Sequence, residues 1–278
     1  MSSHLAPLIF LSDRRGFKPE DDNPDWREIN RITYQRKIDK WSGKAPMNNA
    51  PWWWYLPEEN RYRNDPEMHF PELGNFTVAM GYGQGFMTQS ALLLDEMEHA
   101  GAMLDFTAKA TYYADYKSYI VPEGVEFHPD GKSWFRTADL GNGFQQASIM
   151  KVIRLVIGVD DTDPKALTLI PRIPKSWKGM RADKFPAWVE AGNEGVKRVD
   201  LKFQYKLGDN QASYKLESSG ILPETLLRLG PFNRDIRKNS KVQLNGRNIK
   251  FRITESGDSS WIRIKTPAGL KRLEATVN

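Results

Sequence analysis

Residues 119–161 read YIVPEGVEFHPDGKSWFRTADLGNGFQQASIMKVIRLVIGVDD, and this stretch decides the fold of the chain. It opens with a short apolar run that Pro122 closes, and the Gly-, Pro- and Asp-rich residues that follow predict an irregular loop. Gly141-Asn142-Gly143 then introduces apolar residues at helical spacing, which predict a helix that reaches residue 157 and ends at Gly158. The loop lies where helical patterns give way to strand patterns, and loops between rigid elements often carry function.

Helical patterns dominate the residues before this stretch. Apolar residues recur at helical spacing over residues 83–100 and again over 102–116, with Gly101 as the expected break between the two helices. Two helices with so short a connection predict an antiparallel hairpin. A further helix is expected over about residues 25–42, followed by an aromatic-rich loop at 44–75.

Four charged residues, three in the helical region and one after it, have simple structural interpretations. Asp95, Glu96 and Glu98 are expected on a solvated helix face, because one helical turn points them in different directions. Arg172 lies between two prolines, where we expect an ion-pair partner at the domain interface rather than a site residue.

Strand patterns dominate from Ala166 onward. Short segments of apolar alternation are separated by turn residues, and this predicts an antiparallel β-sandwich. The expected strands cover residues 166–170, 196–205, 212–216, 226–229, 242–244, 248–253 and 261–264. Asn245-Gly246 is the pair typical of a type I′ hairpin turn. We therefore predict an α plus β chain of two domains, a helical region at 1–165 and a sandwich at 166–278.

The composition narrows the classes of function. The chain is 40% hydrophobic and 27% charged, as is typical of a soluble globular protein, and its compartment is left open. It has no cysteine, which excludes disulfides, cysteine-bound zinc and thiol catalysis. Its four histidines lack the spacing of metal ligands, so we expect neither a metal nor a cofactor.

Charge and hydropathy exclude two kinds of partner. The net charge is +5, but the basic residues form no dense block with interleaved aromatics, so we do not expect nucleic-acid binding. No stretch approaches the ~20 apolar residues that span a bilayer. Pro7 interrupts the apolar run Leu5 to Leu11, which also lacks the flanks of a signal peptide.

Several segments, taken in order, resemble the C-terminal portion of six-hairpin glycosidases of the rhamnosidase-like group. They are YIVPEG (119–124), WFRTADLGNGFQQ (134–146), IGVDD (157–161), LIPRIPKSW (169–177), LRLGPF (227–232) and QLNG (243–246). The resemblance covers about residues 75–250. It implies a carbohydrate-active protein in which part of an (α/α) helical-hairpin barrel precedes a β-sandwich.

The helical patterns are too few to close such a barrel. Three interpretations remain open: the chain belongs to a longer protein, a second copy or partner chain completes the barrel, or the barrel is shortened. An incomplete barrel would expose the apolar faces of residues 83–100 and 102–116, and large exposed apolar patches mark interaction surfaces. We therefore expect self-association or a partner that covers these faces.

Glycoside hydrolysis uses two carboxyl groups that flank the scissile bond. The candidates for this catalytic pair are Asp139, at the entrance to the helix that ends at residue 157, and Glu123, directly after Pro122. The resemblance implies that such loops line the sugar site. The alternative is that Asp139 caps the helix and that Glu123 is an ordinary turn residue.

Five further residues are candidates for binding a glycan. Trp134 could stack on a sugar ring, and Arg136 could bind a pair of hydroxyls or lower the pKa of a neighbouring carboxylate. The others are Gln145, His128 and Trp53. Their alternatives are a solvated first helical turn for Gln145, a hydrogen bond within the loop for His128, and an anchoring role for Trp53.

Two classes of function remain open. The first is a glycoside hydrolase that is complete only with upstream or partner residues. The second is a non-catalytic module, derived from a glycosidase, that binds a glycan or another subunit.

Overall fold

The computed structural model describes residues 31, 32, 34, 35, 77–112, 121, 124–127, 134–137, 143–190, 195–233, 236 and 240–278. The chain divides into two compact units. The first comprises Met1–Ile9, Asn23–Ser90 and Ala102–Val152, and the second Phe10–Asp22, Ala91–Gly101 and Ile153–Asn278. Helices and mostly antiparallel sheets are both present, which confirms the α plus β class. The predicted division at residues 165 and 166 stays a prediction.

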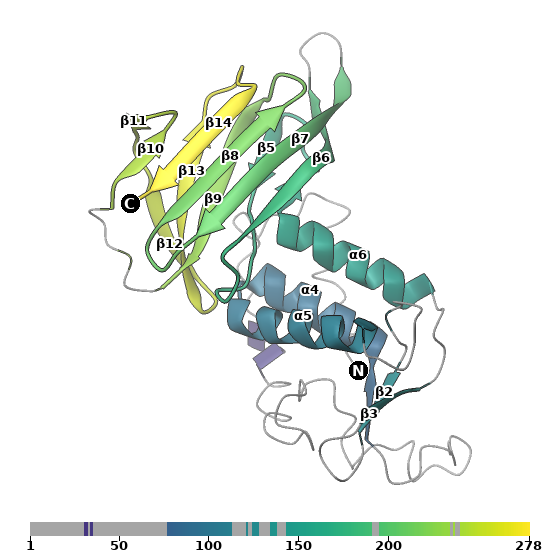
Figure 1. The fold of residues 1–278 in the computed structure, drawn as a ribbon. Helices are drawn as coiled ribbons and strands as arrows, with labels where there is room; N and C mark the ends of the chain where they lie inside the picture. The colour runs from purple at the N-terminus through teal and green to yellow at the C-terminus, as the bar shows by residue number, and fades with distance from the viewer. Residues whose placement is uncertain are drawn as a thin grey trace. The chain divides into compact units, whose positions relative to one another are not determined.

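Three helices carry labels in Figure 1: α4 (Gly81–Leu94), α5 (Met97–Tyr112) and α6 (Gly143–Ile157). Gly158, with a φ of 73°, ends α6 as the sequence predicts. The four described residues of the helix expected over 25–42 are helical. None of the helices in the described ranges is long and apolar enough to cross a membrane.

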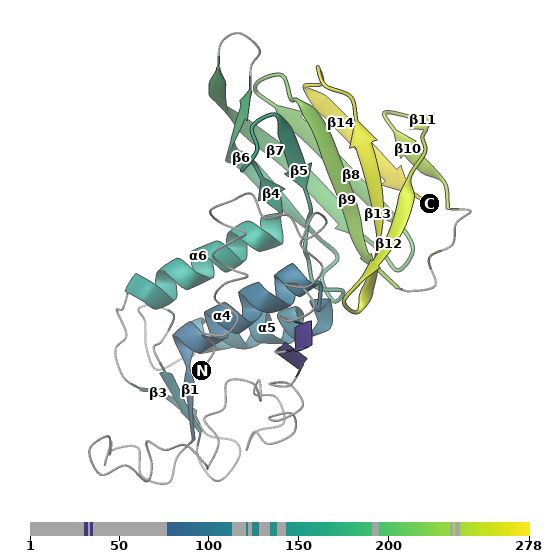
Figure 2. The same ribbon diagram turned by 180° about the vertical axis from the view of Figure 1, so that it is seen from behind.

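Two sheets make up most of the second unit, and they face each other in both views (Figures 1 and 2). The six-stranded sheet has the order β11-β10-β14-β8-β7-β6 and the five-stranded sheet the order β12-β13-β9-β5-β4. Every pair is antiparallel except β5 with β9. The predicted sandwich strands therefore fall in two mostly antiparallel sheets.

The strand bounds of the six-stranded sheet are β6 (Gly179–Glu190), β7 (Val196–Leu207), β8 (Ala212–Ser218), β10 (Val242–Leu244), β11 (Arg247–Asn248) and β14 (Arg272–Val277). Those of the five-stranded sheet are β4 (Val159–Asp160), β5 (Ala166–Leu169), β9 (Glu224–Phe232), β12 (Arg252–Ser256) and β13 (Ser259–Thr266).

Alternating side chains of β7 and β8 form the core between these sheets. Phe203 and Tyr214 stack with their ring centroids 5.6 Å apart. The Tyr205 hydroxyl accepts a hydrogen bond from the Gly230 N–H and donates one to the Gly230 carbonyl, both at 2.9 Å. Burial raises the pKa of Tyr205. This hydroxyl joins β7 of one sheet to β9 of the other, so the core is fixed by a specific polar contact as well as by packing.

Local turn chemistry was predicted correctly, whereas three strands of the two large sheets were missed. Asn245 and Gly246 have φ values of 49° and 76°, and they connect β10 to β11 as the type I′ signal indicates. The sequence did not predict β4, β6 or β14. In β6 the alternation of apolar and polar residues is interrupted between Ala182 and Phe185. A bulge there shifts the register with β7, so the side chains after it change faces relative to the pattern before it.

A three-stranded sheet corrects the prediction of an irregular loop after residue 121. It consists of β1 (Thr77–Met80), β2 (Gly124–Phe127) and β3 (Trp134–Thr137), in the order β1-β2-β3. Its strands pair antiparallel, with Val125 opposite Arg136. Valine, phenylalanine and tryptophan favour strands, but the turn residues between these short segments dominate the sequence pattern.

Helices α4 and α6 approach each other closely within the first unit. A Cβ at Gly85 would lie 1.9 Å from the Ser148 hydroxyl oxygen, so only glycine allows this separation. The Gln89 amide donates to the same hydroxyl at 3.0 Å. Small side chains at the crossing and a buried polar contact together fix how the two helices pack.

The break between α4 and α5 lies at Asp95 and not at Gly101, which corrects both the helix boundary and the expectation of a solvated Asp95. Asp95 is fully buried with a φ of 62°, and its carboxylate binds the Arg228 guanidinium. Gly101 instead lies inside α5, where an added Cβ would come within 2.9 Å of Pro174. The Asp95–Arg228 ion pair, between residues far apart in the sequence, therefore fixes the turn between α4 and α5. Gly101 allows α5 to pack closely against Pro174.

Arg172 is an ion-pair partner, as predicted. Its Nε lies 3.9 Å from Asp95 Oδ1, and both side chains are buried.

The Asp258 carboxylate accepts a hydrogen bond from the Glu98 N–H at 2.9 Å, so a residue between β12 and β13 caps the first turn of α5.

Most of the described apolar residues on the faces of α4 and α5 are buried, so their expected exposure is wrong. Met87, Leu92, Leu93 and Leu94 of α4 are buried within the single chain, as is Met103 of α5. The described residues therefore give no support to self-association or a covering partner, which stays a prediction.

The pH dependence of stability is expected to report on His99. Burial lowers the pKa of His99 below 6.5, against the opposing effect of the Asp258 and Glu98 carboxylates. In the window below pH 6.5 the unfolded chain binds more protons than the folded one, so stability rises with pH there. Denaturant unfolding from pH 5 upward, at about half-unit steps, should show a shallower rise in His99→Gln. Identical slopes in the two proteins would contradict the prediction.

Candidate functional site

The predicted catalytic residues Asp139 and Glu123 lie outside the described residues, as do His128 and Trp53. The backbones of Trp134 and Arg136 lie on β3, and that of Gln145 lies in the first turn of α6. Their side chains are outside what the structure describes. The catalytic pair and these glycan contacts stay predictions.

The residue after Gln145 has a structural role. Gln146 donates from its amide nitrogen to the Val121 carbonyl at 2.9 Å and accepts from the Val121 N–H at 3.4 Å. Its side chain thereby satisfies a backbone that approaches the start of α6, and it is not directed to a ligand.

The described residues bring together a different candidate site at the end of α6. The segment IGVDD ends the helix at Gly158 and runs through β4 to Asp161, seven residues after Arg154. A left-handed glycine at this position lets the chain turn sharply and pair Val159 with Leu169. The turn directs Asp161 back toward the last turn of the helix.

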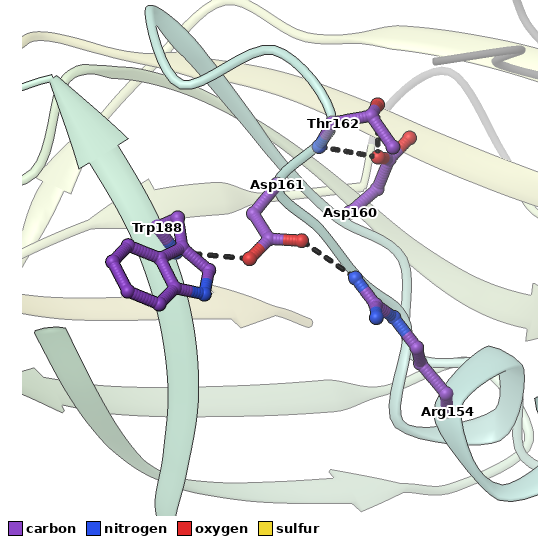
Figure 3. Close-up of polar contacts among 5 residues, drawn as sticks. All are labelled: Arg154, Asp160, Asp161, Thr162 and Trp188. Atoms are coloured by element: carbon purple, nitrogen blue, oxygen red, sulfur yellow. Dashed lines mark hydrogen bonds and ion pairs between the residues drawn. The ribbon is translucent and has the colours of Figure 1, made fainter. Parts of the chain in front are cut away.

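Asp161 joins the loop after β4 to the last turn of α6 and to the edge strand β6 (Figure 3). Its Oδ1 accepts from Arg154 Nη2 at 2.7 Å, and its Oδ2 accepts from the backbone N–H of Trp188 at 2.9 Å. Only 8% of its side chain is exposed, so both carboxylate oxygens are engaged in a sheltered position. The carboxylate fixes the Arg154 guanidinium and the backbone of β6 relative to each other.

The loop between β4 and β5 is stabilised by internal hydrogen bonds and also pairs with the edge strand β6. Asp160 Oδ1 accepts from the Thr162 N–H at 3.1 Å and from the Thr162 hydroxyl at 2.6 Å. The loop also supplies the Pro164 carbonyl, which accepts from the Glu190 N–H at 2.7 Å. Since β6 is an edge strand, these contacts satisfy backbone donors that would otherwise be open to another strand.

These elements border a cleft of about 440 Å³, which we call the Trp188 cleft. It is lined by Arg154, Asp161, Thr162, Pro164, Phe185, Pro186, Trp188 and Val196. Its size lies within the range of small-molecule sites. The lining combines apolar and aromatic surface with one guanidinium, one carboxylate and one hydroxyl, a composition that suits a ligand with both CH faces and hydroxyl groups.

The described lining of the Trp188 cleft lacks the pair of carboxyl groups that glycoside hydrolysis uses. Among the described residues that line it, Asp161 is the single carboxylate, and hydrolysis of a glycosidic bond uses two. Both oxygens of Asp161 already accept hydrogen bonds, so proton transfer to a ligand would break the contacts that shape the cleft. No group of three or more His, Asp or Glu among the described residues could hold a metal ion.

Sequence reasoning missed this cleft although part of its signal was visible. IGVDD is one of the segments that carry the family resemblance, and Arg154 lies three residues before it, in the last turn of the expected helix. Trp188 lies in the strand that the alternation pattern did not predict, so nothing in the sequence placed it beside Asp161.

No family model matches the chain, and comparison with curated proteins gives no match. Among solved structures, the chain is similar to a GH127 beta-L-arabinofuranosidase from Geobacillus stearothermophilus, with a TM-score of 0.34 and 11% sequence identity. The alignment covers 72% of this chain, and it spans 31% of that enzyme.

Proposed function

We propose that this chain is a carbohydrate-active protein of the glycoside hydrolase type, which binds a glycan or acts on it. The observation that carries the proposal is the Trp188 cleft, where an exposed indole lies beside an Arg154–Asp161 ion pair. An aromatic wall next to anchored hydrogen-bonding groups suits a sugar, which has an apolar CH face and a polar rim. The succession of sequence segments that resembles six-hairpin glycosidases supports the same class.

Catalysis under this proposal belongs to the residues around Asp139 and Glu123, which would act as acid and base or nucleophile. Residues 1–165 would form part of an (α/α) barrel that upstream or partner residues complete, and residues 166–278 would form the sandwich domain. Glycan contacts would come from Trp134, Arg136, His128, Gln145 and Trp53.

A second candidate function is a non-catalytic glycan-binding module. The engaged oxygens of Asp161 favour it, because the cleft in the described part of the chain supplies recognition without a free acid or base. The two functions differ in whether the purified chain turns over a substrate.

Substitution of the two carboxylates tests the catalytic function. Asp139→Asn and Glu123→Gln should each lower kcat on aryl glycosides by about a hundredfold or more, because each removes one partner in proton transfer or nucleophilic attack. Asp105→Asn is the matched control, since Asp105 is exposed on α5 and should leave turnover unchanged.

The measurement combines initial rates on a panel of aryl glycosides with binding to immobilised oligosaccharides. Turnover that survives either substitution rules out that residue as acid, base or nucleophile. Glycan binding without any turnover, unchanged by both substitutions, identifies the non-catalytic module instead.

A further inference from the structure

We infer that the Trp188 cleft is a subsite for one neutral sugar residue, which stacks its CH face on Trp188 and places hydroxyls against Arg154 and Thr162. This inference rests on the proposed function and deepens it, since it names the ligand class and the contacts. The described residues that line the cleft all lie in the second unit.

Trp188 is a partly exposed residue on a strand whose backbone is fixed, so a ligand could stack on its indole ring. Trp188 is 53% exposed as a residue although its backbone is bonded on both sides. β7 pairs with it through Arg198, and Asp161 accepts from its N–H at 2.9 Å. A large indole left partly in water on a rigid strand offers apolar area at little cost in conformational entropy.

Arg154 presents donors whose direction is already set. One end of its guanidinium donates from Nη2 to Asp161 at 2.7 Å, while 58% of its side chain remains exposed. A guanidinium has five N–H donors in a planar fork, so its contact with Asp161 orients donors that Asp161 does not use. Two such donors match a pair of neighbouring sugar hydroxyls.

Thr162 adds a hydroxyl to the lining of the cleft. Its hydroxyl donates to Asp160 Oδ1 at 2.6 Å, which orients the oxygen and leaves lone pairs on it. Sugar hydroxyls both donate and accept, and the cleft therefore offers a partner for each role (Figure 3).

The charge balance selects a neutral ligand. Among the described residues that line the cleft, Arg154 and Asp161 carry opposite charges in direct contact, and the other six are uncharged. A phosphate or uronate would have to compete with Asp161 for Arg154 and would meet its carboxylate at close range. A neutral sugar meets neither cost, and about 440 Å³ is large enough for a sugar residue.

The test uses the full-length chain and an array of immobilised neutral oligosaccharides built from glucose, xylose, arabinose or rhamnose, together with uronate oligosaccharides. The best neutral binder is then titrated by calorimetry against Trp188→Ala, Trp188→Phe and Arg154→Met. We expect Trp188→Ala to weaken binding about tenfold and Trp188→Phe to restore part of it, since stacking needs an aromatic face. Arg154→Met should also weaken binding about tenfold.

Two exposed residues of the same unit provide matched controls. Ile221→Ala removes an exposed apolar side chain, and Arg272→Met removes an exposed arginine that faces Glu217 at 3.8 Å. Both should bind like the unaltered chain.

The outcomes separate the subsite from the proposed function. If the unaltered chain binds or hydrolyses glycans and Trp188→Ala and Arg154→Met match the controls, the subsite is wrong while the proposed function stands. If uronate oligosaccharides bind more tightly than neutral ones through this cleft, the assignment of a neutral ligand is overturned. If the unaltered chain neither binds nor hydrolyses any glycan, both fail.

Discussion

Asp95→Asn is expected to lower the free energy of unfolding of the second unit by about 3 kcal/mol or more, the cost typical of removing one partner of a buried ion pair. Asparagine has nearly the same size as aspartate and tolerates the left-handed φ of 62°, so the substitution removes the charge and little else. The loss comes from leaving arginine charge uncompensated in a position closed to water.

The geometry around Asp95 explains the size of this effect. Arg228 donates from Nη1 and Nη2 to the two oxygens of Asp95 at 3.0 and 2.9 Å. The Arg172 Nε lies 3.9 Å from Asp95 Oδ1, and the Arg228 Cζ lies 4.1 Å from the centroid of the Trp261 ring. One buried carboxylate therefore lies against two buried guanidinium groups, one of which also packs on an aromatic face.

An exposed ion pair supplies the control for Asp95→Asn. Lys215 Nζ and Glu274 Oε1 lie 2.8 Å apart, but both side chains are solvated. Glu274→Gln should change stability by about 1 kcal/mol or less. Chemical denaturation followed by circular dichroism, fitted with two transitions if the units unfold separately, measures both. An Asp95→Asn effect no larger than that of Glu274→Gln would show that the buried pair contributes nothing special.

The contrast between Asp95 and Asn245 shows which parts of the fold the sequence could predict. Asn245-Gly246 makes its turn with its own backbone preferences, so two residues were enough to predict it. The turn at Asp95 depends on Arg228, which lies 133 residues later. No local pattern contains that partner, and Gly101 carried the stronger local signal for a break.

The same physical reason separates the predicted site from the Trp188 cleft. Trp188 and Asp161 are 27 residues apart and meet only because the loop after β4 reaches the edge of the other sheet. The exposure of Trp188 depends on which face of β6 it occupies, and the bulge after Ala182 resets that alternation. Residue type, position and the family resemblance favoured Asp139 and Glu123, because these can be read from a sequence and an assembled cleft cannot.

Gly158→Ala is expected to destabilise the second unit by about 3 kcal/mol or more. Gly158 has a φ of 73°, and this backbone strain alone costs a non-glycine residue about 1–3 kcal/mol. An added Cβ would also lie 1.7 Å from the Ile170 carbonyl oxygen. That oxygen belongs to backbone that cannot easily retreat, because the Ile170 N–H donates to the Gly158 carbonyl at 2.6 Å.

Gly246→Ala separates the two contributions at Gly158. Its φ of 76° is nearly the same, and nothing lies within 4 Å of the added Cβ. It should cost only about 1 kcal/mol by denaturant unfolding, and the difference between the two variants measures the steric clash. Equal losses would mean that the backbone at Ile170 yields. Since Gly158 lies between Arg154 and Asp161, Gly158→Ala should also weaken glycan binding at the Trp188 cleft, whereas Gly246→Ala should leave it unchanged.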